Sequence, residues 1–268
     1  MNFNKHLMND LEKYFRNNNG KLISKWIHYF NIYDKHFARF RNEEVVILEI
    51  GVYQGGSLQM WKNYFGPKAK IYGIDIDSRC KQLEEENIKI FIGSQDDRKF
   101  LNEVKKEIPP IDILIDDGGY FVHQQIISFE ELFSHIKHNG VYLCEDIHTS
   151  YRIKFGGGYK RRGSFIEYTK NFIDYMNAFH SQQRCLKVNS FTTSVESIHY
   201  YDSVIVLEKS IIEKPHEEKI GNMVFHELPL KGINKLIFKS TYAIIKVLNL
   251  ILAFFRLPSV AMGKFKWS

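Results

Sequence analysis

Five short apolar runs recur through the middle of the chain, and stretches with helical spacing separate them. The runs cover residues 45–50, 70–74, 88–92, 111–115 and 141–144, and the helical stretches cover 57–64, 79–86, 97–107 and 121–136. Short apolar strands that alternate with helices are typical of right-handed β-α-β units. The pattern therefore predicts an α/β fold with a doubly wound, mostly parallel sheet.

The segments on either side of this core predict further helices and a hairpin. Residues 3–40 are rich in aromatic side chains at helical spacing, including Trp26 and Phe30. We expect these helices to pack on the main domain; a cover over a substrate pocket is the alternative. A helix over 165–180 precedes two apolar runs that Asp202-Ser203 separates, which predicts a closing hairpin. We divide the chain into an N-terminal helical segment (1–43), a main domain (44–210) and a C-terminal helical tail (211–268).

The composition favours a cytoplasmic protein that does not bind nucleic acid. Residues 1–15 lack the uninterrupted apolar stretch of a signal peptide. The three cysteines are few, scattered and odd in number, which fits a reducing compartment and argues against a disulfide framework or a zinc site. The net charge of +6 is concentrated in residues 231–268, which contain six lysines, one arginine and no acidic residue. The rest of the chain is close to neutral and has no basic footprint for nucleic acid.

The C-terminal tail contains the apolar stretch "TYAIIKVLNLILAFFRL", which Lys246 and Asn249 interrupt. Its clean apolar runs are shorter than the ~20 residues that span a bilayer. Packing in the core or across an oligomer interface is one interpretation, and we expect a homo-oligomer. The other is a helix that lies on a membrane surface, with anionic lipid meeting Lys239, Lys246, Arg256, Lys264 and Lys266.

The first three predicted strands end in residues that suit a nucleoside-type cofactor. Ligands of open α/β sheets bind beyond the carboxyl ends of the strands. The first strand continues into "GVYQGGS", whose glycines let the backbone approach a ligand, although the spacing is not the dinucleotide pattern G-x-G-x-x-G. Asp75 follows Gly51 by 24 positions and can accept the hydroxyls of a ribose, and a polar Gly-Ser-Gln follows the third strand. A strand-helix turn with a solvated acid is the alternative.

The fourth and fifth predicted strands end in paired acids, within "IDDGG" and "CEDIH". Asp117, Glu145 and Asp146 therefore come from neighbouring strand ends and are expected to converge. Oxygen ligands without cysteine favour a hard cation, magnesium or calcium, over zinc. The alternative is that these acids only cap turns or helices.

These motifs together resemble the class I S-adenosylmethionine-dependent methyltransferases, specifically the macrocin and mycinamicin O-methyltransferase group, which methylates sugar hydroxyls in macrolide maturation. The resemblance rests on "LEIGVYQGGSLQMW", "IYGIDID", "IDDGG" and "EDIHTSY", extends to "FGGGY" and "FIEY", and covers residues 44–182. It implies a Rossmann-like fold with S-adenosylmethionine at Glu49, Gly51, Gly55, Gly56, Ser57, Asp75, Ser94, Gln95 and Asp116. It also implies Mg²⁺ at Asp117, Glu145 and Asp146.

The sequence departs from this group where the group usually has a histidine as general base after "IDDGG". This chain has Tyr120, so our candidates for proton transfer are Tyr120, then His123, then His148. We expect a cation-assisted in-line attack of a sugar hydroxyl on the sulfonium methyl group. The acceptor would be a glycan, a nucleotide sugar or a glycosylated natural product.

Two other functions remain open from the residues alone. A non-catalytic S-adenosylmethionine-binding protein would explain Tyr120 as a mark of lost activity. An NAD-type oxidoreductase is disfavoured because the dinucleotide glycine pattern is absent. The basic loop "YRIKFGGGYKRRG" after the second acid pair is suited to a phosphate or carboxylate on the acceptor, or is simply solvated.

Overall fold

The computed structural model of the chain describes residues 8–225, 232–255, 257 and 259–261. These residues form two compact units. The first contains residues 8–177 and 188–213, and the second contains 178–187 and the described part of 214–261.

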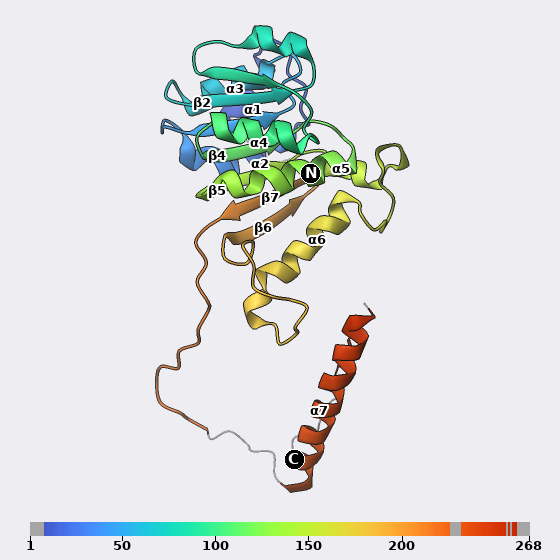
Figure 1. Ribbon diagram of the computed structural model, residues 1–268. Helices are drawn as coiled ribbons and strands as arrows, with labels where there is room; N and C mark the ends of the chain where they lie inside the picture. Colours follow the sequence, from blue (N-terminus) through green and yellow to red (C-terminus); the bar gives the residue numbers. More distant parts are fainter. Residues whose placement is uncertain (1–7, 226–231, 256, 258, 262–268) are drawn as a thin grey trace, which may run out of the picture. The chain divides into compact units, whose positions relative to one another are not determined.

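The first unit is built on a seven-stranded sheet in the order β3-β2-β1-β4-β5-β7-β6 (Figure 1). Strands β1 to β5 run parallel, while β7 pairs antiparallel with both β5 and β6. The strands are β1 (Val46–Ile50), β2 (Lys70–Asp75), β3 (Ile88–Ile92), β4 (Ile111–Asp116), β5 (Ile136–Cys144), β6 (Val195–Tyr201) and β7 (Val204–Lys209). The predicted fold class, a doubly wound and mostly parallel α/β sheet, is therefore confirmed.

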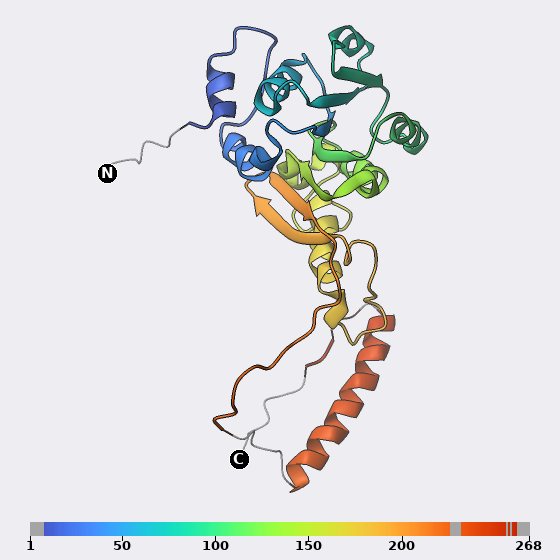
Figure 2. The same cartoon turned by 90° about the vertical axis from the view of Figure 1, so that its left-hand side faces the viewer.

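Helices cover both faces of the sheet, and successive strand residues face opposite layers (Figures 1 and 2). On one face, Ile47 and Ile113 belong to a core with Trp61, whereas Leu48 and Leu114 belong to the core on the other face. The first layer contains α1 (Asp10–Arg16), α2 (Tyr29–Phe37) and α3 (Gly56–Phe65), and the second contains α4 (Arg98–Glu107), α5 (Val122–Leu132) and α6 (Phe165–Met176). Short 3-10 helices are η1 (Ala38–Phe40), η2 (Ser78–Leu83), η3 (Phe133–His135), η4 (Ile147–Tyr151), η5 (Ile153–Phe155) and η6 (Ala178–His180).

Two predicted helices were wrong in extent. The helix expected over 79–86 is the shorter η2, after which Asn87 adopts a left-handed conformation (φ 67°) that returns the chain to β3. The helix expected over 121–136 ends at Leu132, because β5 begins at Ile136 and pairs with Ile111 before a bulge. Residues 137–140 are polar and resemble a turn in sequence, so the first part of β5 was not predicted as strand. The predicted N-terminal helices are present as α1 and α2, but Trp26, which the spacing places on a helix, lies in the irregular segment between them.

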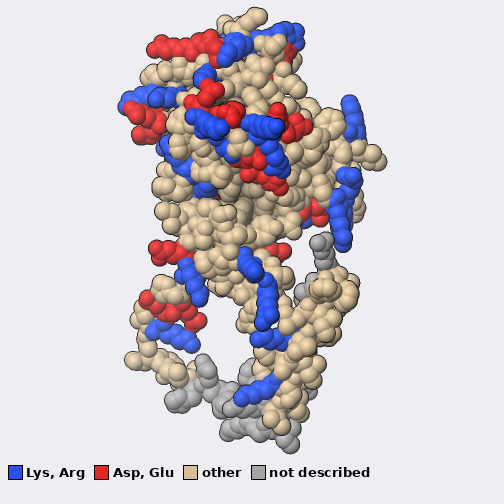
Figure 3. Space-filling view, in the orientation of Figure 1, with Lys and Arg blue, Asp and Glu red and all other residues tan. Residues whose placement is uncertain are grey.

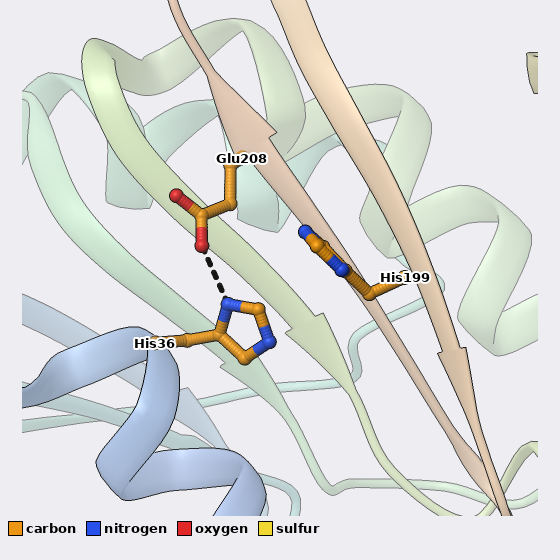
Figure 4. Close-up of side chains that lie close together, drawn as sticks. All are labelled: His36, His199 and Glu208. Carbon is orange, nitrogen blue, oxygen red and sulfur yellow. Dashed lines mark hydrogen bonds and ion pairs between the residues drawn. The ribbon is translucent and has the colours of Figure 1, made fainter.

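The predicted hairpin is present as β6 and β7, and a polar cluster attaches α2 to it (Figure 4). His36 bonds Glu208 through Nδ1 at 2.5 Å and the Tyr201 hydroxyl through Nε2 at 2.9 Å. Arg39 donates to the second Glu208 carboxylate oxygen at 2.8 Å. His199 completes the cluster, whose His and Glu ligand atoms lie within 4.8 Å of one another. Both His36 nitrogens and both Glu208 oxygens are therefore already bonded within the protein.

The second unit contains α7 (Gly232–Phe254). Apolar side chains on α7 are solvent-exposed, among them Leu236, Ile244, Val247, Ile251 and Phe254. Among the described residues, no helix combines the length and apolarity that crossing a membrane requires.

The His36–Glu208 bond predicts a pH-dependent contribution to stability. That bond, together with the Arg39 guanidinium, lowers the pKa of Glu208 from 4.5 to about 2. A depressed carboxyl pKa stabilises the fold above the unfolded-state pKa, and this contribution is lost as pH falls through the folded-state value. We expect Glu208→Gln to lower the free energy of unfolding by about 1–2 kcal/mol at neutral pH, and by clearly less at about pH 3.

Urea denaturation at both pH values measures this difference. Glu196→Gln, an exposed position on β6, is the matched control and should change neither value. An equal loss of stability for Glu208→Gln at both pH values would contradict the electrostatic origin.

Candidate active site at the carboxyl edge of the sheet

A cavity of about 1080 Å³ lies beyond the carboxyl ends of β1 to β5. It brings together the two groups of residues that the sequence assigned to a cofactor and to a cation. The predicted residues that line it are Gly51, Ser57, Asp75, Ser94, Gln95, Asp117, Tyr120, Glu145, Asp146 and His148. Parallel strands cause this convergence, because all their carboxyl ends lie at one edge.

The glycine-rich turn after β1 is fixed by a close approach and by Asp75. Gly51 has a φ of 94°, and an added Cβ atom would lie 2.1 Å from the Asp117 carbonyl oxygen. One carboxylate oxygen of Asp75 accepts the backbone N–H groups of Val52 and Tyr53, both at 2.9 Å. Asp75 therefore orients the turn as well as lining the cavity.

Two acids that were predicted to bind cofactor lie beneath the cavity lining. Glu49 is buried and accepts the Ser57 hydroxyl at 2.8 Å and the Trp61 ring N–H at 3.1 Å. Asp116 is buried and accepts the Gln95 side-chain amide at 3.0 Å. Burial raises the pKa of Glu49 to about 7 and that of Asp116 to about 6. In this structure both acids orient lining residues, and their direct contact with a cofactor stays a prediction, as do the cofactor roles of Gly55 and Gly56.

Asp117, Glu145 and Asp146 are called the acidic group below. Lys25, which sequence reasoning missed, lies between two of its members. Its Nζ is 2.5 Å from Asp117 Oδ2, 2.8 Å from Glu145 Oε1 and 3.9 Å from Glu49 Oε1, and its side chain is 2% exposed. Burial alone would lower the pKa of Lys25, but the three carboxylates outweigh it and raise the pKa above its ordinary value. Lys25 is therefore a buried ammonium that compensates the negative charge of Asp117 and Glu145.

Two tyrosines of α2 hold the second pair of acids. The Tyr33 hydroxyl donates to Glu145 Oε1 at 2.6 Å, and the Tyr29 hydroxyl donates to Asp146 Oδ1 at 2.8 Å. Burial, followed by the Asp117 carboxylate, raises the pKa of Glu145 to about 8. Asp146 has a left-handed backbone (φ 52°), a conformation that is uncommon outside glycine and that often occurs at functional sites.

The acidic group fits a hard divalent cation. Asp117, Glu145 and Asp146 offer carboxylate oxygens alone, and an ammonium already rests between two of them. Among the described residues, only the His36 cluster brings three ligand groups within 4.8 Å of one another. The three acids therefore have to move closer, and Lys25 has to yield, before they surround one ion.

Of the three proton-transfer candidates, two line the cavity. Burial, followed by the Asp117 carboxylate, raises the pKa of Tyr120, whose ring packs against Phe155. His148 bonds Ser203 through Nδ1 and lies 3.8 Å from Asp146 Oδ1. His123 is not among the lining residues; it is 60% exposed and bonds Asp96.

The segment between α1 and α2 forms one wall of the cavity. Residues 22–27 all line it, and the Leu22 carbonyl oxygen lies 2.3 Å from the position of a Cβ added to Gly56. Trp26 is 55% exposed and faces His148 edge-on, whereas Phe30 is fully buried. The prediction of core packing is therefore confirmed for Phe30, whereas Trp26 lines the cavity and its role as a cover over a substrate stays a prediction.

The strand order, the antiparallel β7 and a site at this edge define the class I methyltransferase fold. The relatives are more specific. The chain is 42% identical over 146 residues to the demethylmacrocin O-methyltransferase of Streptomyces fradiae, across 51% of this chain and 36% of that protein. It is 35% identical over 199 residues to the mycinamicin VI 2''-O-methyltransferase of Micromonospora griseorubida, across 69% and 49%. The resemblance to the macrocin and mycinamicin sugar O-methyltransferases is therefore confirmed.

Solved structures agree with this assignment. The MycE methyltransferase of mycinamycin biosynthesis, in complex with Mg and SAH, matches with a TM-score of 0.60 and 33% identity, covering 68% of this chain and 50% of MycE. A second crystal form matches with a TM-score of 0.66 and 28% identity, covering 86% and 58%. The chain thus spans about half the length of these relatives. No family model matches the chain.

Proposed function

We propose that the protein is an S-adenosylmethionine-dependent, cation-assisted O-methyltransferase that acts on a sugar hydroxyl. The observation that carries the proposal is one cavity in which nucleoside-type residues and a cation-holding acidic group lie side by side. The relatives include the mycinamicin VI 2''-O-methyltransferase and an O-methyltransferase of a rhamnosyl tetracenomycin from Streptomyces olivaceus, which supports a glycosylated natural product, a glycan or a nucleotide sugar as acceptor.

Gly51, Asp75, Ser94 and Gln95 would hold S-adenosylmethionine, which supplies an activated methyl group when bound. Asp117, Glu145 and Asp146 would hold Mg²⁺, which supplies Lewis-acid stabilisation of a developing alkoxide when bound. The chain's own residues place the acceptor between these two groups, and this positioning accounts for much of the rate enhancement we expect.

Proton transfer is assigned to the residues that line the acidic side of the cavity. Tyr120 is proposed to orient the acceptor hydroxyl, and it can accept a proton only if a cation offsets the carboxylates that raise its pKa. His148 is the second candidate because its ring lies next to Asp146. His123, which the sequence places second, ranks below both because it is exposed and does not line the cavity.

The loop after β5 is proposed to receive an anionic group of the acceptor. Figure 3 shows Lys and Arg side chains on the flank of the molecule over this loop. Arg152 lines the cavity, and the same loop carries Lys154, Lys160, Arg161 and Arg162. A phosphate or carboxylate on the acceptor would therefore find guanidinium and ammonium donors beside the site.

A non-catalytic S-adenosylmethionine-binding protein is the alternative, and Tyr120 in place of histidine is the observation that favours it. A screen of sugars, nucleotide sugars and glycosylated natural products with a labelled methyl donor separates the two functions. Transfer to any sugar hydroxyl supports the enzyme, whereas tight cofactor binding without transfer to any acceptor supports the alternative.

Asp75 provides a test of cofactor binding. Asp75→Ala removes a charged acceptor worth about 1.5–3 kcal/mol per hydrogen bond, so S-adenosylmethionine affinity should fall at least about tenfold in calorimetry. Asp174→Ala, an exposed position on α6, is the control. Unchanged affinity in a folded Asp75→Ala protein would remove Asp75 from the site.

The acidic group provides a test of cation dependence. Asp117→Asn should reduce methyl transfer by at least about a hundredfold while S-adenosylmethionine affinity changes by less than about threefold, because Asp117 serves the cation and the acceptor. Glu103→Gln, which is exposed on α4, should leave both unchanged. Full transfer activity of the unmodified protein in excess chelator would contradict cation assistance.

We propose that α7 lies on an anionic membrane surface, since its exposed apolar side chains occur beside Lys239 and Lys246 and the segment 231–268 has no acidic residue. Figure 3 shows the largely uncharged surface of this helix. The further basic residues predicted to meet lipid, Arg256, Lys264 and Lys266, lie outside the described residues.

Flotation with anionic liposomes tests this contact. At low salt the full chain should float, and a Lys239→Glu/Lys246→Glu variant should not, because each basic residue near the surface contributes about 1 kcal/mol. Lys214→Glu/Lys219→Glu is the control of equal charge. If the full chain does not float with the liposomes and is a dimer in solution, the apolar face of α7 packs against a second copy of the chain instead.

A further inference from the structure

The buried ammonium of Lys25 occupies the position that the proposed function gives to a divalent cation. We propose that Lys25 is a built-in competitor for this cation, and that binding of the cation releases the wall segment 22–27 from the site. The inference rests on the proposed cation site, and it concerns what regulates that site.

The ammonium and a divalent cation would compete for one pair of oxygens. Lys25 Nζ lies 2.5 Å from Asp117 Oδ2 and 2.8 Å from Glu145 Oε1. Mg²⁺ bound to the same two oxygens would lie about 2.0–2.1 Å from each of them. An ion there would lie within a few ångströms of Nζ, and the two positive charges would repel each other, so we expect Lys25 to leave this position when the oxygens take a metal ion.

Charge decides the direction of the exchange. Glu49, Asp117 and Glu145 surround a single ammonium, and Asp146 adds a fourth carboxylate nearby. A divalent ion offsets twice the charge that one ammonium offsets. A displaced Lys25 that remained buried would be a charge without its partners, which is strongly unfavourable, so its side chain has to move towards water.

The segment that carries Lys25 is built to move with it. Residues 17–27 contain no helix or strand. Besides Lys25, the contacts of the segment include the burial of Ile23, the packing of Leu22 on Gly56 and the edge-on contact of the Trp26 ring with His148. Trp26 follows Lys25 directly and lines the cavity beside His148. Release of Lys25 therefore changes the wall that faces the acceptor.

Calorimetric titration of the full chain with MgCl₂ tests the competition. Lys25→Met keeps the length and apolar stem of the side chain and removes its charge, so Mg²⁺ should bind at least about tenfold more tightly than to the unmodified protein. Lys21→Met, an exposed position in the same segment, should bind Mg²⁺ as the unmodified protein does. Equal or weaker Mg²⁺ binding by Lys25→Met would overturn the competition.

Hydrogen–deuterium exchange measures the release without reference to activity. Peptides that cover residues 21–27 should exchange faster when Mg²⁺ is added to the unmodified protein, and should exchange fast in Lys25→Met with or without Mg²⁺. Slower or unchanged exchange on addition of Mg²⁺ to the unmodified protein would overturn the release. If Lys25→Met does not fold, Lys25→Arg keeps the charge and a larger head group, and should retain the weak Mg²⁺ affinity of the unmodified protein; tighter binding by Lys25→Arg would contradict competition by charge.

The outcomes separate this inference from the proposed function. Equal Mg²⁺ binding to both proteins, together with chelator-sensitive methyl transfer, would reject the role of Lys25 and keep the cation-assisted enzyme. Absence of Mg²⁺ binding in both proteins, with intact S-adenosylmethionine binding, would reject the cation site itself and with it the competition.

Discussion

Repulsion among carboxylates at one edge of the sheet is the constraint on which the site depends. Two like charges 4 Å apart repel by about 4 kcal/mol in the environment typical of a protein surface. Burial raises the pKa of Glu49 to about 7 and that of Glu145 to about 8, and the Asp117 carboxylate adds to both shifts. Negative charge on these side chains is therefore unfavourable unless a cation compensates it. Lys25 relieves the repulsion, because its buried ammonium reaches three of the acids at once.

The strand order explains why these acids meet. β1 lies between β2 and β4, which is the point where the order of the parallel strands reverses and where ligands of such sheets bind. The polar ends of β1, β2 and β3 lie on the cofactor side of this point, and those of β4 and β5 lie on the acidic side. Gly51 joins the two sides, because its missing side chain allows the Asp117 carbonyl to approach the turn.

The sequence was sufficient to predict the sheet and the residues at its strand ends. Short apolar runs that alternate with helical stretches predict parallel strands, and the residues that follow such strands must lie at one edge of the sheet. The sequence did not predict whether the side chain at each strand end points into the core or into the cavity. Asp116 and Asp117 are neighbours in "IDD", yet Asp116 lies in the core with Gln95 and Ser128 while Asp117 lines the cavity.

Lys25 was beyond sequence reasoning for a different reason. It lies 92 residues from Asp117 and 120 residues from Glu145 along the chain, in a segment that forms neither helix nor strand. Only the folded position of this segment brings it to the acids. Trp26 misleads in another way, since its spacing to Phe30 predicts a helix although the backbone at Trp26 is irregular.

The central claim is that Asp117, Glu145 and Asp146 form a cation site whose occupant in the metal-free chain is Lys25. Anomalous diffraction from crystals soaked with MnCl₂ tests it most directly, because Mn²⁺ prefers the same oxygen ligands as Mg²⁺ and can be located by its anomalous scattering. The account predicts an anomalous peak for a Mn²⁺ ion that Asp117 and Glu145 coordinate, with Lys25 Nζ displaced from both carboxylates. A peak elsewhere, or Lys25 still bonded to Asp117 and Glu145 in Mn²⁺-saturated crystals, would contradict it.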